Sequence, residues 1–292
     1  MNKKRRLLSG LAMVAASCLA LAGCSSSGSG PEVAENPEFA DGTTMAKLAD
    51  AGTITIGTKF DQPLFGLSGP DGTPEGFDVE IGKIIAADLG ISPDKIKWVE
   101  TVSQNREAFI QNGTVDIVIA TYTINDKRKE VIDFGGPYYV AGQSFLVPAG
   151  NPGGITTEEG KIADSLEGKT VCTVVGSTSE ENVREYTEKV MTVDKYSDCI
   201  EPMRSGQADA LTTDNVILAG LADQNKGEFE VVSGTFTEEP YGIGLKKGDD
   251  EFRNYINDTL EAAYEDGRWE EAWKSTVGDN LELPEPPAVD RY

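Results

Sequence analysis

The sequence contains no histidine. Histidine is the general base of Ser-His-Asp and Cys-His nucleophilic sites, so both kinds of catalytic site are excluded. The HExxH zinc motif and most other catalytic zinc sites are excluded as well, because they need imidazole ligands. The chain therefore does not perform any of these classes of chemistry.

Positive charge is also scarce. The chain has 26 Lys and Arg residues against 49 Asp and Glu residues, a formal net charge of −23. A surface of this kind repels phosphate backbones and anionic lipid headgroups. Nucleic acid is therefore not expected as a partner, and no basic patch is expected to hold the chain on a membrane. Outside residues 1–23, no apolar run is long enough to span a bilayer.

The first 24 residues have the pattern of a secretory leader. Four basic residues precede an apolar stretch over residues 7–22 that is rich in small side chains and short for a membrane span. Leu21-Ala22-Gly23-Cys24 follows, and this sequence resembles the processing site of bacterial lipoproteins. The resemblance implies that residues 1–23 are a lipoprotein signal peptide and that Cys24 carries a diacylglycerol. The protein would then be extracytoplasmic and anchored to the cell membrane by this lipid. An ordinary secretion signal with an incidental cysteine is the alternative.

Cysteine is another scarce residue, with four in the chain. Cys18 leaves with the predicted signal and Cys24 is predicted to carry lipid, so Cys172 and Cys199 remain. Two cysteines make a poor metal site, and in an extracytoplasmic protein a disulfide between them is expected. Such a bridge stabilises a chain by about 3–4 kcal/mol in the chain-entropy model. Two free buried thiols are the alternative.

Strand-like and helix-like segments alternate after a flexible polar linker over residues 24–43. β-rich runs predict strands at residues 54–58, 115–121, 144–148, 170–175, 208–213, 229–233 and 241–245. Apolar periodicity predicts helices at residues 77–89, 106–111, 179–190, 215–224, 251–264 and 268–275. This alternation indicates an α/β fold with parallel sheets covered by helices, and such sheets bind ligands beyond the C-terminal ends of their strands.

Four sequence blocks occur in order along the body of the chain. They are GFDVEI at residues 76–81, ATYTINDKR at 120–128 with the IDF and PYY segments that follow, ADALTTD at 208–214, and YGIGLKK at 241–247. Together they resemble the polar amino-acid-binding proteins of ABC importers, over about residues 44–277. Within that family the chain is most similar to lipid-anchored glutamate-binding proteins of actinobacterial importers, on the segments GTKFDQP at 57–63, SQNR at 103–106 and the sequence around Cys172 and Gly176.

The resemblance implies a two-lobed α/β fold of the type II periplasmic-binding-protein kind, with the ligand in the cleft between the lobes. Lobe 1 is expected to comprise residues 44–138 and 242–277, and lobe 2 residues 139–241. Two hinge crossings are expected near residues 139–143 and 238–241. Residues 278–292, which contain Leu283-Pro284-Glu285-Pro286-Pro287, are expected to form an extended C-terminal tail.

An α-amino acid presents a carboxylate and an ammonium group at a fixed separation, so its recognition needs a cation and an acid held rigidly apart. Arg128 stands at the family's carboxylate clamp, and a guanidinium binds a carboxylate bidentately. The resemblance makes Asp214 the ammonium acceptor. It also makes Thr121 a contact of the ammonium, and Thr123 and Thr178 contacts of the carboxylate, with Thr178 at the start of a helix.

The ligand's side chain is expected to meet a second set of residues. Lys59 ends the first strand, and Ser103 and Arg106 match positions that contact the side-chain carboxylate in acidic-amino-acid binders. Tyr196 occupies a position where some relatives have a further side-chain contact. A hydroxyl and two cations fit a second carboxylate, which favours glutamate.

The resemblance implies a protein that captures glutamate, and aspartate as a second candidate, and delivers it to the subunits of an ABC permease. It implies a monomer with no cofactor, no metal ion and no catalytic residues. The alternatives are a binding protein for another polar amino acid such as glutamine, a ligand sensor, and a dehydratase on the same fold. If Lys59 and Arg106 instead pair with neighbouring acids such as Asp61 and Glu107, the preference for an acidic ligand is lost.

Overall fold

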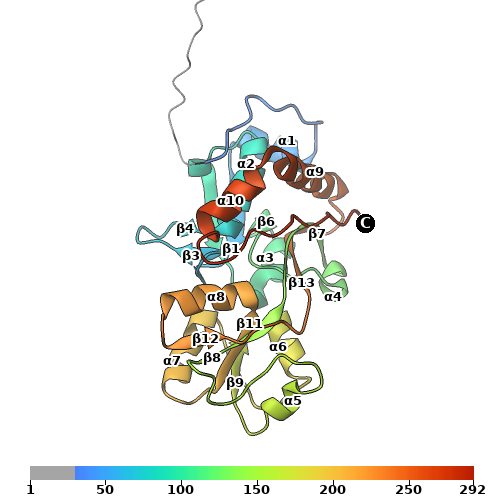
Figure 1. Ribbon diagram of the computed structural model, residues 1–292. Helices are drawn as coiled ribbons and strands as arrows, with labels where there is room; N and C mark the ends of the chain where they lie inside the picture. Colours follow the sequence, from blue (N-terminus) through green and yellow to red (C-terminus); the bar gives the residue numbers. More distant parts are fainter. Residues whose placement is uncertain (1–29) are drawn as a thin grey trace, which may run out of the picture.

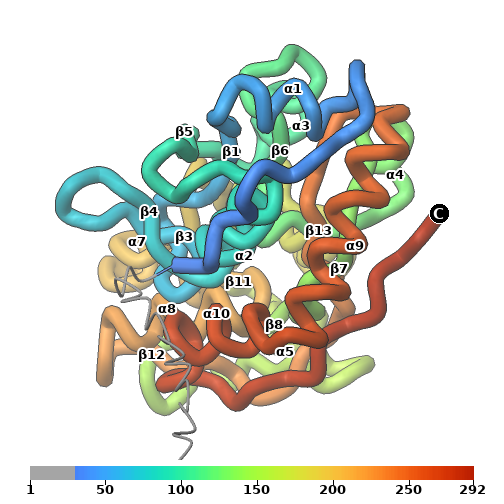
Figure 2. Tube along the Cα trace, turned by 90° about the horizontal axis from the view of Figure 1, so that it is seen from above, coloured from blue at the N-terminus to red at the C-terminus, as the bar shows by residue number. Residues whose placement is uncertain are grey.

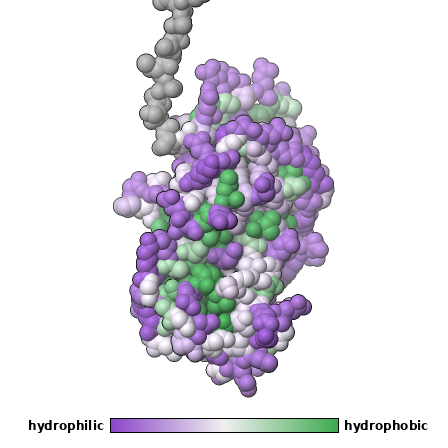
Figure 3. Space-filling model, viewed as in Figure 1, coloured by the Kyte–Doolittle hydropathy of each residue, from purple (hydrophilic) through white to green (hydrophobic). Residues whose placement is uncertain are grey.

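The computed structural model describes residues 30–292. The predicted signal peptide and the predicted lipid site at Cys24 lie outside the described residues. Two α/β lobes lie one above the other in Figure 1, and each is built on a five-stranded sheet. The two-lobed fold predicted from the sequence is confirmed. Hydrophilic residues dominate the face of the molecule shown in Figure 3, as the excess of charged residues predicts.

The sheet of lobe 1, the upper lobe in Figure 1, has the strand order β5-β1-β6-β13-β7. Its strands are β1 (Ile54–Thr58), β5 (Ile96–Glu100), β6 (Ile117–Val118), β7 (Ile132–Ala141) and β13 (Glu239–Lys246). β1 pairs in parallel with β5 and β6, whereas β13 pairs antiparallel with β6 and β7. A three-stranded sheet follows β1 and consists of β2 (Asp61–Gln62), β3 (Gly66–Ser68) and β4 (Pro74–Glu75).

The helices of lobe 1 include the predicted apolar helix near residue 80. They are α1 (Thr44–Ala51), α2 (Phe77–Asp88), α3 (Arg106–Gln111), α4 (Asp126–Lys129), α9 (Asp250–Asp266) and α10 (Arg268–Thr276), with short 3₁₀ turns η1 (Pro93–Lys95) and η2 (Ser103–Asn105). In α2, the buried residues Phe77, Ile81, Ile84 and Ile85 recur at helical spacing. The helix is followed by Gly90 at φ 75°, a backbone conformation that favours glycine.

Lobe 2 has the strand order β10-β9-β11-β8-β12. Its strands are β8 (Gln143–Pro148), β9 (Val171–Val174), β10 (Val190–Val193), β11 (Ala210–Asp214) and β12 (Phe229–Val231). Its helices are α5 (Ile162–Ser165), α6 (Thr178–Val183), α7 (Ile200–Arg204) and α8 (Asn215–Gln224), with the 3₁₀ turn η3 (Tyr196–Cys199).

Two predicted elements differ from the structure. The helix predicted over residues 179–190 ends at Val183, and Val190–Val193 forms β10 in parallel pairing with β9. The prediction was wrong there because β-branched residues in this stretch complete a sheet edge, and pairing with a buried strand overrides a weak helical pattern. The strand predicted over residues 115–121 is confined to β6, because the chain bends at Thr121, where φ is 43°.

The two crossings between the lobes lie side by side. Near the lobe boundary, Glu239 of β13 pairs with Ala141 of β7, and Tyr241 pairs with Tyr139. The crossing segments therefore form one antiparallel ribbon, which is the hinge of the molecule. The ring of Tyr139 stacks on Trp273 of α10 with centroids 5.0 Å apart, so the hinge is packed firmly against lobe 1.

The described part of the N-terminal segment lies on lobe 1. The amide of Ala34 donates to the carbonyl of Ala87 at 2.9 Å, which fixes the segment at the end of α2. The ring of Phe39 packs edge-to-face against Tyr255 of α9, with centroids 5.5 Å apart. From residue 30 onward, the segment predicted as a flexible linker is therefore in contact with the folded body.

The C-terminal tail also lies on lobe 1. In Figures 1 and 2 it runs from α10 toward α9 and β7. The amide of Asp290 donates to the carbonyl of Gly136 at 2.7 Å, and the amide of Phe134 donates to the hydroxyl of Tyr292 at 2.9 Å. The tail thus covers part of β7, which is an edge strand of its sheet. Among residues 30–292, no helix has the length and apolar character needed to cross a membrane.

Candidate functional site

The nine predicted ligand contacts come together where the two lobes meet. Lobe 1 contributes six and lobe 2 contributes three. Eight of them are buried, each with at most 7% of its surface exposed, and Thr178 is half-buried. The residues are Lys59, Ser103, Arg106, Thr121, Thr123 and Arg128 from lobe 1, and Thr178, Tyr196 and Asp214 from lobe 2. We call this set the inter-lobe site.

Lys59 and Arg106 form the cationic end of the inter-lobe site. The ammonium of Lys59 donates to Ser103 Oγ at 2.8 Å. Arg106 donates from Nε to the carbonyl of Ser103 at 3.2 Å and from Nη1 to the carbonyl of Ala120 at 3.1 Å. Within residues 30–292 neither cation forms an ion pair, and Glu107 pairs with Arg128 instead. The alternative in which both cations are neutralised by neighbouring acids is therefore not what the structure contains.

Arg128 is held by its own helix and by α3. Asn125 caps α4 by accepting from the backbone amide of Arg128 at 2.8 Å. The guanidinium donates from Nε to Glu107 at 3.1 Å and from Nη1 to the carbonyl of Thr123 at 2.6 Å. These contacts fix the plane of the guanidinium in the inter-lobe site.

The ring of Tyr122 holds the two guanidinium groups close together. The guanidinium carbon of Arg106 lies 4.2 Å from the ring centroid, and that of Arg128 lies 4.9 Å from it. Cation–π attraction offsets part of the cost of burying two like charges next to each other. Tyr122 was not predicted as a site residue, although it lies inside the ATYTINDKR block.

Asp214 ends β11 and supplies the buried acid of the site. One carboxylate oxygen, Oδ2, accepts from the hydroxyl of Tyr241 at 2.6 Å. The other, Oδ1, is buried and has no partner within residues 30–292. Burial, together with the nearby negative charge of Glu239, raises the pKa of the Asp214 carboxyl to about 7, although the hydrogen bond from Tyr241 lowers it.

Burial has the opposite effect on Lys59. Burial, together with the positive charge of Arg106, lowers the pKa of the ammonium to about 7. The negative charges of Asp61 and Asp78 act against this shift. Lys59 and Asp214 are therefore both poised to change charge near neutral pH.

The sequence of the chain matches the family model of bacterial extracellular solute-binding proteins, family 3, over residues 54–278. The chain belongs to this family. It is 39% identical over 264 residues to the glutamine-binding protein GlnH of an ABC transporter of Bacillus subtilis. The matched region covers 89% of this chain and 93% of that protein. It is also 39% identical over 253 residues to the glutamate-binding protein GluB of Corynebacterium efficiens, covering 83% and 84% of the two chains.

Solved structures agree with this assignment. The solute receptor for L-cysteine of Neisseria gonorrhoeae superposes with a TM-score of 0.76 at 30% sequence identity, covering 85% of this chain and 99% of that one. The protein is therefore an amino-acid-binding protein of ABC importers, which binds its ligand and delivers it to permease subunits.

In this solute-binding protein, Glu239 is a buried acid that sequence reasoning missed. It lies at the start of β13, in the hinge, and is 2% exposed. Its carboxylate accepts from Thr178 Oγ1 at 2.8 Å, from Asn182 Nδ2 at 3.1 Å and from Thr237 Oγ1 at 2.8 Å. Glu239 thus ties the hinge to α6 and orients Thr178. The only sequence signal is its place just before the YGIGLKK block.

Asp78 is a second buried acid that was not predicted as a site residue. Its carboxylate accepts from the backbone amide of Thr121 at 2.7 Å and from the hydroxyl of Tyr138 at 2.6 Å. Thr121 has φ 43°, which is unusual for a β-branched residue. Asp78 therefore holds the bent backbone that carries Thr121 into the site, and this explains why an acid of α2 is completely buried.

Several contacts between the lobes enclose the site. Thr123 of lobe 1 and Thr178 of lobe 2 place their hydroxyl oxygens 3.4 Å apart, and Lys127 of α4 pairs with Glu181 of α6 at 2.5 Å. Residues at and just before η3 form further contacts between the lobes. The lobes are thus in a closed arrangement. Among the residues that the structure describes, no group of three or more acidic or cysteine side chains is placed to hold a metal ion.

Proposed function

We propose that this protein binds L-glutamate, with L-aspartate as a second ligand, and delivers it to an ABC permease. One observation carries the proposal: Lys59 and Arg106 are buried side by side in the inter-lobe site and neither is paired with a carboxylate of residues 30–292. Buried cations are strongly destabilising unless an anion meets them. A carboxylate at the end of the ligand's side chain supplies that anion.

The α-amino and α-carboxylate groups have partners of their own in this proposal. Arg128 binds the α-carboxylate, and Thr123 and Thr178 lie beside it. The unpartnered oxygen of Asp214 accepts from the α-ammonium, and Thr121 is the second proposed contact of that ammonium. The ligand's two negative groups and one positive group thus each meet an opposite charge.

Glutamine is the second candidate, because the chain is as similar to a glutamine-binding protein as to a glutamate-binding one. An amide at the ligand's side-chain end would offer a carbonyl to one cation but point its NH₂ group toward donors. It would leave positive charge uncompensated in a buried place. This charge argument favours glutamate over glutamine.

The proposal is for binding without chemistry, as opposed to the dehydratase alternative. Two buried acids at the site, Asp214 and Glu239, accept hydrogen bonds from Tyr241 and from three side chains respectively. Those contacts suit groups that hold a ligand in place. We further propose that the protein is a monomer, carried outside the cytoplasm by residues 1–23 and held there by lipid on Cys24.

Competition titration of glutamate against glutamine tests the ligand. The wild type is expected to prefer glutamate by at least about a hundredfold, or about 2.7 kcal/mol. Arg106→Ala is expected to weaken glutamate far more than glutamine, because only glutamate has the second carboxylate, so the ratio of affinities shrinks. Lys127→Ala removes an exposed cation that is already paired with Glu181 and is the matched control, with an unchanged ratio. Equal wild-type affinities for glutamate and glutamine, or an unchanged ratio of these affinities in Arg106→Ala, would contradict the proposal.

A further inference from the structure

Three consecutive residues of lobe 2 each contact lobe 1. Asp194 accepts from the side-chain amide of Gln104 at 3.0 Å, and Lys195 forms an ion pair with Glu100. The backbone amide of Tyr196 donates to the carboxylate of Asp61 at 2.9 Å. These residues lie directly after β10 and lead into η3. We call residues 194–199 the latch segment.

Asp61 caps η3 from the opposite lobe. A helical turn begins with backbone N–H groups that lack internal partners. The residue that precedes η3, Lys195, supplies no capping hydrogen bond from its side chain. The amides of Tyr196 and Ser197 instead stabilise the carboxylate of Asp61, which belongs to β2 of lobe 1 and is 9% exposed. This cap exists only while the lobes are together, so it favours the closed arrangement.

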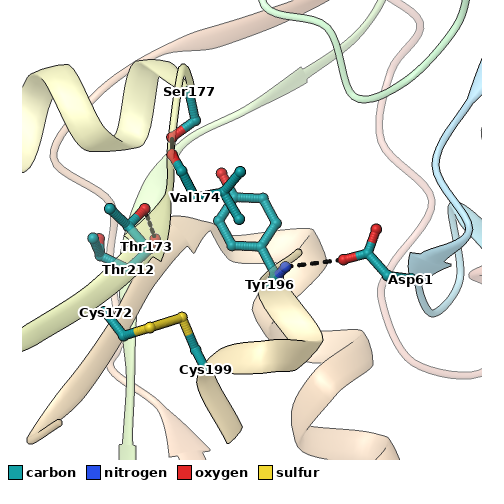
Figure 4. Close-up of a disulfide and its surroundings, with 8 residues drawn as sticks. All are labelled: Asp61, Cys172, Thr173, Val174, Ser177, Tyr196, Cys199 and Thr212. Carbon is teal, nitrogen blue, oxygen red and sulfur yellow. Dashed lines mark hydrogen bonds between the residues drawn. A yellow bond between two sulfur atoms is a disulfide. The ribbon is translucent and has the colours of Figure 1, made fainter. Parts of the chain in front are cut away.

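The far end of the latch segment is tied to the sheet of lobe 2. Cys199 is the last residue of η3, and it forms the disulfide predicted from the sequence with Cys172 of β9. Both cysteines are completely buried. Figure 4 shows the bridge on one side of Tyr196 and Asp61 on the other. Since β10 is an edge strand bonded only to β9, the disulfide is the covalent tie that fixes where η3 stands.

We propose that residues 194–199 act as a closure latch, in which the Cys172–Cys199 disulfide holds η3 at the position where Asp61 can cap it. Asp61 and the disulfide are positioning groups: they act on ligand affinity through the equilibrium between open and closed lobes. A protein that spends less time closed binds every ligand more weakly by the same factor. The inference rests on amino-acid binding between the lobes, but not on glutamate being the ligand.

A double-mutant cycle tests the latch, with glutamate and glutamine as probes. Asp61→Ala, and the pair Cys172→Ala with Cys199→Ala, are each expected to raise the dissociation constant and the dissociation rate by roughly threefold to thirtyfold. In the cysteine variant both ligands are expected to be weakened by the same factor, whereas Asp61→Ala also removes a negative charge that raises the pKa of Lys59. Because both changes act through η3, the combined variant is expected to lose much less than the product of the two losses. Asp61→Asn keeps one acceptor oxygen and is expected to restore part of the affinity.

Lys127→Ala is the matched control in this cycle. It removes another contact between the lobes, the ion pair with Glu181, which does not involve η3. Its effect is expected to multiply with that of the cysteine pair, because the two sites are independent. Small-angle X-ray scattering of the ligand-free variants gives a second readout, in which Asp61→Ala is expected to shift the molecule toward a larger radius of gyration.

Three results would overturn the proposed latch. The first is a multiplicative loss in the combined variant of Asp61 and the cysteines. The second is unchanged affinity without the disulfide. If the cysteine variants fail to fold, the wild type reduced with dithiothreitol, which leaves two cysteine thiols and the cyclic oxidised reagent, replaces them in the cycle. The third is a changed ratio of the glutamate and glutamine affinities in the cysteine variant. The ratio in Arg106→Ala tests the ligand assignment separately, so either proposal can fail alone.

Discussion

Two single residues, Lys59 and Asp214, are expected to make ligand binding depend on pH. Asp214 faces Glu239, Tyr241 and the two arginines of the site, and burial raises its pKa to about 7. As the pH falls below this value the carboxylate gains a proton, so the ligand's ammonium loses its anionic partner. Burial lowers the pKa of Lys59 to about 7. As the pH rises above this value the ammonium loses its proton, so a side-chain carboxylate loses a cationic partner.

The affinity for glutamate is therefore expected to peak near pH 7 and to fall on both sides, whereas the affinity for glutamine is expected to fall mainly on the acid side. Calorimetric titration between about pH 5.5 and about pH 8.5 measures both profiles. Lys59→Met keeps an apolar side chain of similar length and is expected to remove the alkaline decline for glutamate. Glutamate binding that is independent of pH over this range would contradict the assignments of both residues.

At this scale, the sequence points to the proposed ligand contacts more readily than to the residues that hold them in place. Arg128 and Asp214 stand inside blocks whose resemblance to a family is plain, and the structure brings them to one site. Asp78, Tyr122 and Glu239 act through other residues across long stretches of sequence: Asp78 bonds Thr121, 43 positions away. No local pattern reveals such a pairing, because it arises only when the lobes are folded.

At the scale of the elements, the C-terminal tail makes contacts with lobe 1 that the sequence did not predict. The ring of Tyr292 lies between Lys129 of α4 and Arg253 of α9, with the cations 4.0 Å and 4.3 Å from its centroid. Its hydroxyl accepts from the amide of Phe134 on β7. The tail thus joins α4, α9 and β7 of lobe 1, and α4 is the helix that carries Arg128.

Tyr292→Ala is expected to lower the free energy of unfolding by about 1–2 kcal/mol, because two cation–π contacts and one hydrogen bond are lost. Tyr292→Phe keeps the ring and loses only the hydrogen bond, so about half of that loss is expected. Urea denaturation of the three proteins gives the comparison. A Tyr292→Ala variant as stable as the wild type would mean that the tail contributes nothing to lobe 1.

Element types were predicted well where one face of a segment is clearly apolar, as in α2 with Phe77, Ile81 and Ile85. Element types were predicted poorly where pairing with a strand distant in sequence determines the secondary structure. Residues 96–100 form β5, although no strand was predicted there, because this short edge strand has no regular alternation of polar and apolar residues and is defined by its pairing with β1. The latch segment lies in a stretch predicted as neither helix nor strand, and its place is defined by the disulfide and by contacts with lobe 1 that are distant in sequence.

At the scale of the whole molecule, a strongly acidic chain encloses a cationic site. The net charge of −23 belongs mainly to exposed carboxylates, whose fields are screened by salt over about 10 Å. Lys59, Arg106 and Arg128 are buried, so their attraction for an anion is screened much less. Closure of the lobes therefore determines both whether the ligand is held and how strongly the site attracts a carboxylate.

Because the chain is so acidic, the predicted lipid on Cys24 is the expected membrane attachment of the whole molecule. Removal of residues 1–23 takes away four basic residues and no acidic one, so the remaining chain is repelled by anionic lipids more strongly than the full chain. Each acyl CH₂ buried in the bilayer contributes about 0.8 kcal/mol, and a diacylglycerol has two chains. Attachment is thus expected to depend on one sulfur atom, that of Cys24.

Cys24→Ser is expected to move the protein from the membrane fraction of a bacterial host to the soluble extracytoplasmic fraction. Affinity for glutamate is expected to stay within about twofold, because all the proposed ligand contacts lie between Lys59 and Asp214 and the family match begins at residue 54. Cys18→Ser is the matched control, because that cysteine lies within the predicted signal and is expected to change neither property. Fractionation followed by immunoblotting measures the distribution. A Cys24→Ser protein that still sediments with membranes and is released only by detergent would show that something other than this lipid holds the chain there.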